Sequence, residues 1–197
     1  MAFVGGSASL SVMKARQWLH NLVVAASLPI LFASAAVAQT AKLDDLFARL
    51  KDADEQSSVR IEREIALEWS KSGSAAMDLL LQRGRDAVDA GQPAIAIEHL
   101  TALVDHAPDF AEGWNARATA WFAAGEFGPA VEDLARALQL NPRHFQAMVG
   151  FGAILEEIER PAQALEVYRA ALELNPQMAD VKAAVARIEA DLAGQDI

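Results

Sequence analysis

Histidine and acidic side chains are the residues of this sequence that could bind a metal or transfer a proton. Residues 39–197 contain three histidines, His99, His106 and His144. His99 and His106 are seven residues apart, and each directly follows an acid, so both could lie on one face of a helix. A metal site needs convergent ligands that further groups hold in place, whereas the helix ends near His106, before Pro108. We therefore interpret these two as ordinary surface histidines and predict no metal.

Sequence motifs that indicate catalysis are absent. The chain has no glycine-rich phosphate loop, no Gly-x-Ser-x-Gly turn and no His-Glu-x-x-His pair. It also has no cysteine, which excludes thiolate zinc sites, disulfides and cysteine nucleophiles. Neighbouring acids such as Glu156-Glu157 and Asp44-Asp45 would point in different directions on a helix, and we interpret them as solvated surface. The prediction is a protein that is not an enzyme and needs no cofactor.

Composition narrows the class of protein further. The 197 residues carry a net charge of −10, 53% of them are apolar, and only one is tyrosine. This length fits one domain with an extension, and the composition suits helices better than a β-sandwich. The excess of acid argues against nucleic acid as a partner, because phosphate binding needs a basic surface.

The first 38 residues have the pattern of an export signal. Basic Lys14 and Arg16 are followed by an apolar stretch over residues 22–32 and by small residues ending in Ala-x-Ala at residue 38. A spanning helix needs about 20 apolar residues, so this stretch is too short. We predict that residues 1–38 are a cleaved secretory signal peptide, with an uncleaved anchor as the alternative.

This signal predicts a location. Its short Ala-x-Ala end looks bacterial, so we expect a periplasmic protein that begins near Gln39 and keeps no stable membrane anchor after cleavage. Met13, directly before the basic segment, is an alternative translation start. Residues 1–38 carry two basic residues and no acid, and without them the net charge changes from −10 to −12.

Similar residues recur every 34 positions along the chain. Within each repeat, the apolar positions fall at i, i+4 and i+7, which is the spacing of one helix face. One column holds small residues that would let a partner helix approach closely. Two further columns hold glycines, broken by Glu159, that would end first helices, and prolines that would stop second helices. These columns are Gly84, Ala118 and Gly152; Gly91 and Gly125; and Pro108, Pro142 and Pro176.

Three segments of the chain resemble the motif of the tetratricopeptide repeat (TPR) family. They are Trp114-x-x-Arg117-Ala118-x-x-Trp121, Ala130-x-x-x-Leu134-x-x-Ala137 and Asn141-Pro142. The resemblance implies an all-α, right-handed solenoid of helical hairpins. Arg83 and Arg117 depart from it, because the motif usually has leucine there. For Arg117 we consider two interpretations, a pair with Asp133 and a solvated side chain.

The predicted organisation has three clear repeats between two flanking regions. An N-terminal helical pair bends at Asp52-Ala53-Asp54, with a degenerate fourth repeat as the alternative interpretation. A C-terminal capping helix presents Val181, Val185 and Ile188 inward. The boundaries are 1–38 for the signal, 39–74 for the N-terminal pair, 77–110, 111–144 and 145–178 for the repeats, and 179–197 for the capping helix and tail.

The resemblance also implies a binding surface, because first helices of TPR units line a concave groove that receives a peptide or a partner helix. Family members that clamp a C-terminal carboxylate have cations and asparagine in positions where this chain has Leu81, Ala116, Gln146 and Gly150. Arg85 is then the only cation of the lining. By position, Glu156 and Asp89 would flank a groove with an apolar centre at Phe122 and Val149. The lining residues would be Leu81, Arg85, Asn115, Thr119, Phe122, Gln146, Val149 and Ala153.

Two kinds of function remain open at this stage. The first is an exported, non-catalytic scaffold that binds a protein or peptide partner in its groove, in the bacterial cell envelope. Its acidic surface would favour basic partners or partners bridged by divalent cations. The second is a structural subunit that self-associates or is fixed in a larger envelope complex, with no transient ligand. A third interpretation is that the N-terminal helices fold back and fill the groove. The sequence leaves the oligomeric state open.

Overall fold

The computed structural model describes residues 39–195, and the predicted signal lies outside them. The chain divides into two compact units, Met1–Asp45 and Leu46–Ile197. The described part of the first unit, residues 39–45, is helical. In the second unit, helical residues 46–51 are followed by eight helices and no strand over the described residues.

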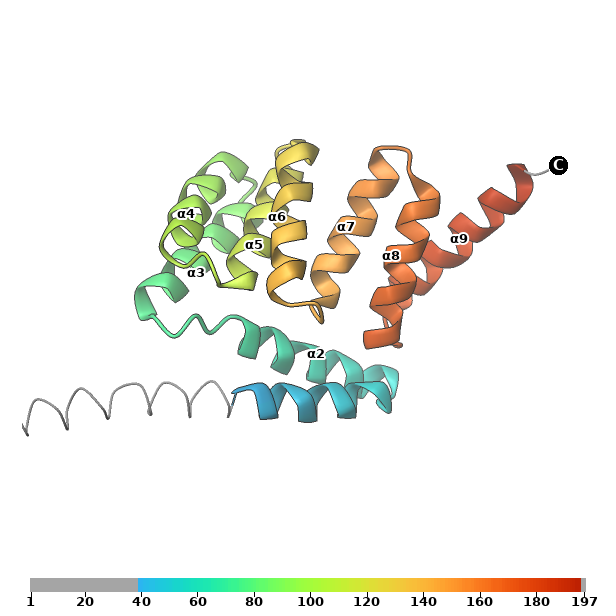
Figure 1. Cartoon of the computed structure of the whole chain (residues 1–197), viewed down its shortest axis with the longest axis horizontal. Helices are drawn as coiled ribbons and strands as arrows, with labels where there is room; N and C mark the ends of the chain where they lie inside the picture. Colours follow the sequence, from blue (N-terminus) through green and yellow to red (C-terminus); the bar gives the residue numbers. More distant parts are fainter. Residues whose placement is uncertain (1–38, 196–197) are drawn as a thin grey trace, which may run out of the picture. The chain divides into compact units, whose positions relative to one another are not determined.

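Six of these helices form three stacked hairpins, α3 with α4, α5 with α6 and α7 with α8 (Figure 1). This all-α stack confirms the predicted fold class. Buried side chains from consecutive hairpins form the core, for example Leu81, Leu100 and Leu103 in the first. The helices are α3 (Ala75–Asp89), α4 (Pro93–His106), α5 (Ala111–Ala123), α6 (Phe127–Leu140), α7 (Phe145–Glu157) and α8 (Pro161–Leu174).

The small residues of the repeat stand where the two helices of a hairpin come closest. A Cβ added at Gly84 would meet the Leu100 side chain at 2.4 Å, and one added at Gly152 would meet the Tyr168 ring at 2.4 Å. Ala118, the third member of the column, is buried beside Leu134. The close approach predicted from the sequence is therefore present, and each hairpin fills it with a large side chain from its second helix.

The first helix of every hairpin ends in the same way. Gly91, Gly125 and Glu159 all have positive φ, at 68°, 78° and 59°. In each case the N–H of the next residue bonds back to the carbonyl five positions earlier, as Gln92 does to Ala87. This is the Schellman motif, in which a left-handed residue satisfies the last carbonyls of a helix. Glu159 thus adopts the glycine conformation without being glycine.

The two arginines that depart from the repeat motif differ in the structure. Arg117 forms two hydrogen bonds to the carboxylate of Asp133, at 2.7 and 2.8 Å, and lies over the Trp114 ring. The predicted pair is confirmed, and the alternative of a solvated Arg117 is wrong. Arg83, in contrast, is exposed. The Arg117 pair links α5 to α6, and a third bond to Thr101 reaches α4.

Helix α9 (Ala179–Gln195) covers the end of the stack. Val181 and Ile188 are buried against α7 and α8, and the charged residues on the other face are exposed, namely Asp180, Lys182, Arg187, Glu189 and Asp191. The acid Glu156 of α7 accepts hydrogen bonds from the Tyr168 hydroxyl of α8 and from Arg187 of α9. The interpretation of Glu156 as solvated surface was therefore wrong, because this carboxylate joins three helices.

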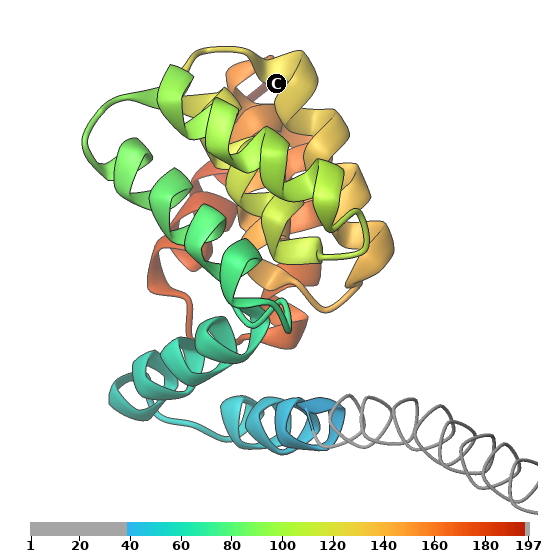
Figure 2. The ribbon, with the colours of Figure 1, turned by 90° about the vertical axis from the view of Figure 1, so that its left-hand side faces the viewer.

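The second helix of the predicted N-terminal pair does not continue the row of hairpins. Helix α2 (Glu55–Trp69) follows the predicted bend, where Asp54 caps it by accepting the Ser57 N–H. In both views α2 crosses below the hairpins instead of extending their row (Figures 1 and 2). Its last residue, Trp69, stacks on His144 at the start of α7. The reason is aromatic packing, since Phe47, Trp69 and Phe145 form one buried cluster.

Adding one methyl group at Gly152 should separate α7 from α8. We expect Gly152→Ala to lower the free energy of unfolding by about 1–3 kcal/mol, the usual cost of overpacking. Gly150→Ala is the matched control, because a Cβ there lies 3.8 Å from Leu134, an ordinary contact, and alanine favours a helix by about 1 kcal/mol. Urea unfolding measures both variants. Equal stability of the two would contradict the close approach.

Glycine should suit position 159 better than glutamate does. A non-glycine residue in the left-handed region costs about 1–2 kcal/mol, so Glu159→Gly should raise the free energy of unfolding by about 0.5–1 kcal/mol after the entropy of glycine is subtracted. Glu157→Gly, two residues earlier and still helical, should instead lower it by about the same amount. A shift of the thermal midpoint in the same direction for both variants would disprove this.

Candidate functional site

Two adjoining hollows lie on the face formed by the first helices of the hairpins. One, of about 120 Å³, is mostly apolar and is lined by Phe122, Leu134, Ala153 and Ile154 among others. The other, of about 280 Å³, is polar and extends toward α3. We call the two together the inner groove. Asn115, Thr119 and Gln146 line both hollows, so these three polar residues stand where they meet.

Six of the eight residues predicted for the lining border the inner groove. They are Arg85, Asn115, Thr119, Phe122, Gln146 and Ala153. Phe122 is 39% exposed and packs against Phe127 on its other side.

The other two predicted lining residues lie elsewhere. Leu81 is only 2% exposed and belongs to the core of the first hairpin. Val149 borders a separate hollow between α2, α7 and α9. The apolar centre of the groove is therefore formed by Phe122 with Ala153 and Ile154, which lie about one helical turn after Val149 on α7.

The inner groove is open over the described second unit. Helix α2 contributes none of the side chains that line either hollow. Its last residue, Trp69, lies instead beside the start of α7, and Ser70 accepts a hydrogen bond from Arg85 in α3. Helix α2 thus leaves the groove unfilled.

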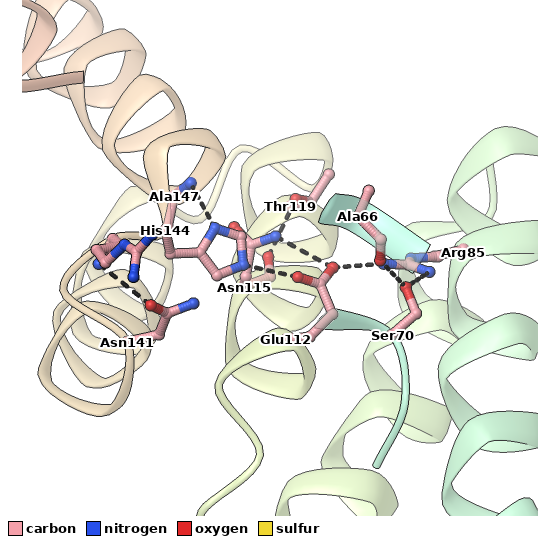
Figure 3. A network of polar contacts seen from close by, with 10 residues as sticks. Ala66, Ser70, Arg85, Glu112, Asn115, Thr119, Asn141, His144 and Ala147 are labelled. Atoms are coloured by element: carbon pink, nitrogen blue, oxygen red, sulfur yellow. Dashed lines mark hydrogen bonds and ion pairs between the residues drawn. The ribbon is translucent and has the colours of Figure 1, made fainter. Parts of the chain in front are cut away.

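A chain of polar contacts, buried at Glu112 and His144 and partly exposed at Arg85, joins α2 to all three first helices (Figure 3). Arg85 of α3 donates to Ser70, which caps the end of α2, at 2.9 Å, and to Glu112 of α5 at 2.5 Å. The second carboxylate oxygen of Glu112 lies 2.7 Å from Nε2 of His144, at the start of α7. Trp69 covers the His144 ring at a centroid distance of 4.2 Å. The chain therefore holds three consecutive repeats and α2 together.

The contacts of His144 determine which of its ring nitrogens carries the proton. The histidine is fully buried and caps α7, since its Nδ1 accepts the backbone N–H of Ala147 at 3.2 Å. A nitrogen that accepts a hydrogen bond carries no proton, so the proton lies on Nε2 and is donated to Glu112. His144 thus satisfies the first turn of α7 and one oxygen of Glu112 at once.

Glu112 remains ionised in spite of its burial. Burial by itself raises the pKa of this carboxyl, but the hydrogen bond from His144 and the positive charge of Arg85 outweigh it, and the pKa lies below its ordinary value of 4.5. Its position in the first turn of α5, where the helix dipole favours a negative charge, acts in the same direction. The charge of Arg85 is consequently neutralised inside the structure.

Sequence reasoning missed this polar chain. Nothing in the 34-residue columns marks Glu112 or His144, which are 32 residues apart. One available signal was position, because both stand at the start of a predicted first helix, where carboxylates and capping groups are favoured.

Residues 39–195 contain no cluster of three or more His, Cys, Asp or Glu side chains placed to hold a metal. His99 and His106 both lie on α4, and His106 is its last residue. None of the helices described for the chain is long and apolar enough to cross a membrane.

Comparison with known proteins agrees with this geometry. Tetratricopeptide repeat profiles match residues 81–128 and 121–188. A TPR repeat-containing protein of Rhizobium etli is 35% identical over 156 residues, which cover 78% of this chain and 76% of that protein. A Bos taurus SGT1 homolog is 30% identical over 115 residues, but these are only 34% of its length and 58% of this chain.

Solved structures share the fold. The first TPR domain of Spaghetti (RPAP3), bound to the HSP90 peptide SRMEEVD, matches with a TM-score of 0.59 and 26% identity, over 61% of this chain and 95% of that one. MamA matches with a TM-score of 0.57 and 21% identity, over 76% of this chain and 85% of that one, which shows the common fold. The chain belongs to the tetratricopeptide repeat family, and it is homologous to a bacterial member of that family.

Removing the charge of Glu112 should weaken the fold in a pH-dependent way. We expect Glu112→Gln to lower the free energy of unfolding at pH 7 by about 1–3 kcal/mol, because the buried partners lose a charged acceptor. A lowered pKa adds stability above the unfolded value of 4.5 and loses it as the pH falls below that value. The difference in the free energy of unfolding between the variant and the original protein should therefore become smaller in acid.

Urea unfolding at neutral pH and below pH 4.5 measures this difference. Glu157→Gln, which removes an exposed carboxylate from the end of α7, is the matched control and should change stability by less than about 0.5 kcal/mol. A difference that stays constant across this pH range would show that the charge of Glu112 has no role in stability.

Proposed function

We propose that this protein is an exported, non-catalytic adaptor of the bacterial cell envelope that binds a peptide or protein partner in its inner groove. One observation carries the proposal: an apolar hollow remains open between α5 and α7 although the core around it is complete. An apolar concavity rimmed by a few polar groups is the usual form of a recognition site. Asn115 and Gln146 offer amide groups at its edge that could bond the backbone of an extended chain.

Two comparisons support a peptide or protein as the ligand. The RPAP3 domain, 26% identical to this chain, was solved with a peptide bound. The TPR2B domain of yeast Sti1, also similar in fold, was solved in a complex with pHsp70. Both are TPR domains, so the same use of the fold is the simplest proposal for this chain.

The proposed location rests on the sequence of residues 1–38. Their basic, apolar and small-residue segments are typical of a secretory signal peptide. A periplasmic adaptor would begin near Gln39 and would carry the net charge of −12 of the remaining chain. This part of the proposal is independent of the groove and is tested separately below.

Site-specific photo-crosslinking in living cells tests the adaptor function. A photoreactive residue in place of Phe122 should give one discrete adduct with another protein, while the same probe at Glu132, exposed on α6, should give none. Phe122→Ala should weaken capture of that protein by about tenfold, as expected for a partly buried aromatic anchor, and should leave helicity unchanged. Mass spectrometry identifies the adduct and shows whether the crosslinked chain begins near Gln39.

Other outcomes would overturn the proposal in different ways. Adducts of the chain with itself would favour a self-associating structural subunit. Equal adducts at Phe122 and Glu132 would place the binding surface outside the inner groove. A chain that keeps its first 38 residues in the cytoplasmic fraction would contradict export but not binding.

A further inference from the structure

Two carboxylates at the end of α3 stand beside the inner groove. Asp86 and Asp89 are exposed and three residues apart, so they share one face of the last helical turn. Asp89 lines the polar hollow of the groove. Together with Asp86 it also lines a third hollow of about 630 Å³ between α3 and the end of α2.

No partner within residues 39–195 neutralises these two carboxylates. The nearby cations are already engaged, because Lys71 pairs with Glu68 at 2.7 Å and Arg85 with Glu112 at 2.5 Å. Neither Asp86 nor Asp89 forms an ion pair in the described part of the chain. The end of a helix is also the place where its dipole disfavours negative charge, so this pair of acids does not favour the fold.

The third hairpin shows how the same chain treats an acid near the end of a first helix. Glu156, in the last turn of α7, is paired with Arg187 of α9 and accepts a bond from Tyr168. At the corresponding end of α3, no helix among residues 39–195 supplies an arginine to Asp86 or Asp89. A cation from outside the described residues would complete α3 in the way that Arg187 completes α7.

We infer that the partner segment combines an aliphatic side chain, held in the apolar hollow, with a lysine or arginine held by Asp86 and Asp89. This inference rests on the proposed function and specifies the chemistry of the ligand for the same groove. The apolar hollow is lined by Phe122, Ala153 and Ile154, and its volume of about 120 Å³ suits one aliphatic side chain. Opposite charge at the α3 end then determines the orientation of the segment.

Helix spacing sets the separation of the two side chains in the partner. Neighbouring packed helices lie about 8–10 Å apart, so the apolar hollow between α5 and α7 is about 12–15 Å from the end of α3. An extended chain advances about 3.3 Å per residue, so the aliphatic and basic residues should be about three to five positions apart. Asn115 and Gln146 line both hollows and lie between the two positions, where the Gln146 amide would meet the backbone of the segment.

The structure also argues against an acidic C-terminal tail as the ligand. Arg85, the one cation among the described residues that border the inner groove, is bonded to Glu112 and Ser70. The Arg85 side chain is 41% exposed, but the buried carboxylate of Glu112 already balances its positive charge. The negative charge of Asp86 and Asp89 would repel an acidic segment.

Selection from a phage-displayed library of random linear peptides tests the inference, with the full chain as the target. Peptides enriched on the original protein should pair Leu, Ile, Val or Met with Lys or Arg at the stated separation. The charge-reversed variant D86K/D89K should lose the basic preference, and A153L, which fills the hollow, should lose the aliphatic one. E132K/E166K is the matched control, because it makes the same charge change on exposed positions of α6 and α8.

A peptide chosen by the original protein then gives the size of the effect. Its affinity for D86K/D89K, measured by fluorescence anisotropy, should be weaker by about threefold to tenfold, the scale of one or two solvent-exposed ion pairs, and this difference should shrink in high salt. E132K/E166K should bind like the original protein. The thermal midpoints of all variants establish that they are folded.

The remaining outcomes separate the two proposals. Peptides whose capture depends on Phe122 and Ala153 but shows no basic preference would overturn this inference and leave the adaptor function standing. A basic preference that survives in D86K/D89K would also overturn it. If no peptide is enriched, or if F122A and A153L capture the same peptides as the original protein, both the inference and the proposed function fail.

Discussion

The close contact between the two helices of each hairpin is the constraint on which this structure depends. At Gly84 and Gly152 the facing Leu100 and Tyr168 occupy the space that a Cβ would need. The contact brings each second helix against its first helix and leaves part of the surface of the first helix outside the core. Asn115 and Gln146 lie on that part of the surface. The groove is thus a consequence of how the hairpins close, and no separate structural element is needed to form it.

Local features of the fold could be predicted because they depend on neighbours in the sequence. Helix faces follow from the spacing of apolar residues, and helix ends follow from Gly91, Gly125 and the recurring prolines. The exception at position 159 shows the limit of this reasoning. The sequence column marks Glu159 as a deviation, whereas its φ of 59° shows that the backbone keeps the repeat geometry there. The position in the repeat thus determines the backbone conformation of residue 159 in spite of the preference of glutamate for negative φ.

The site could be predicted only in part, because its remaining features depend on how helices that are far apart in the sequence are oriented against one another. Six lining residues follow from the position of the first helices. The path of α2 depends on the packing of Phe47, Trp69 and Phe145, which no periodicity reveals. Acidic residues are usually exposed, so the sequence offered no reason to expect that Glu112 is buried or that Glu156 joins three helices.

The crossing of α2 has a mechanical consequence for the solenoid. In a solenoid whose repeats contact only their neighbours, the stack can extend, and its repeats can unfold one at a time. Here the end of α2 reaches the first repeat through Ser70 and Arg85 and the third through Trp69 and His144, and Glu112 joins the two from the second. By contacting all three repeats, the end of α2 fixes how each repeat is oriented relative to the next. The three repeats should therefore bend and unfold as one body. The distances between positions along the inner groove then stay constant, so they limit the length of the segment that can bind there.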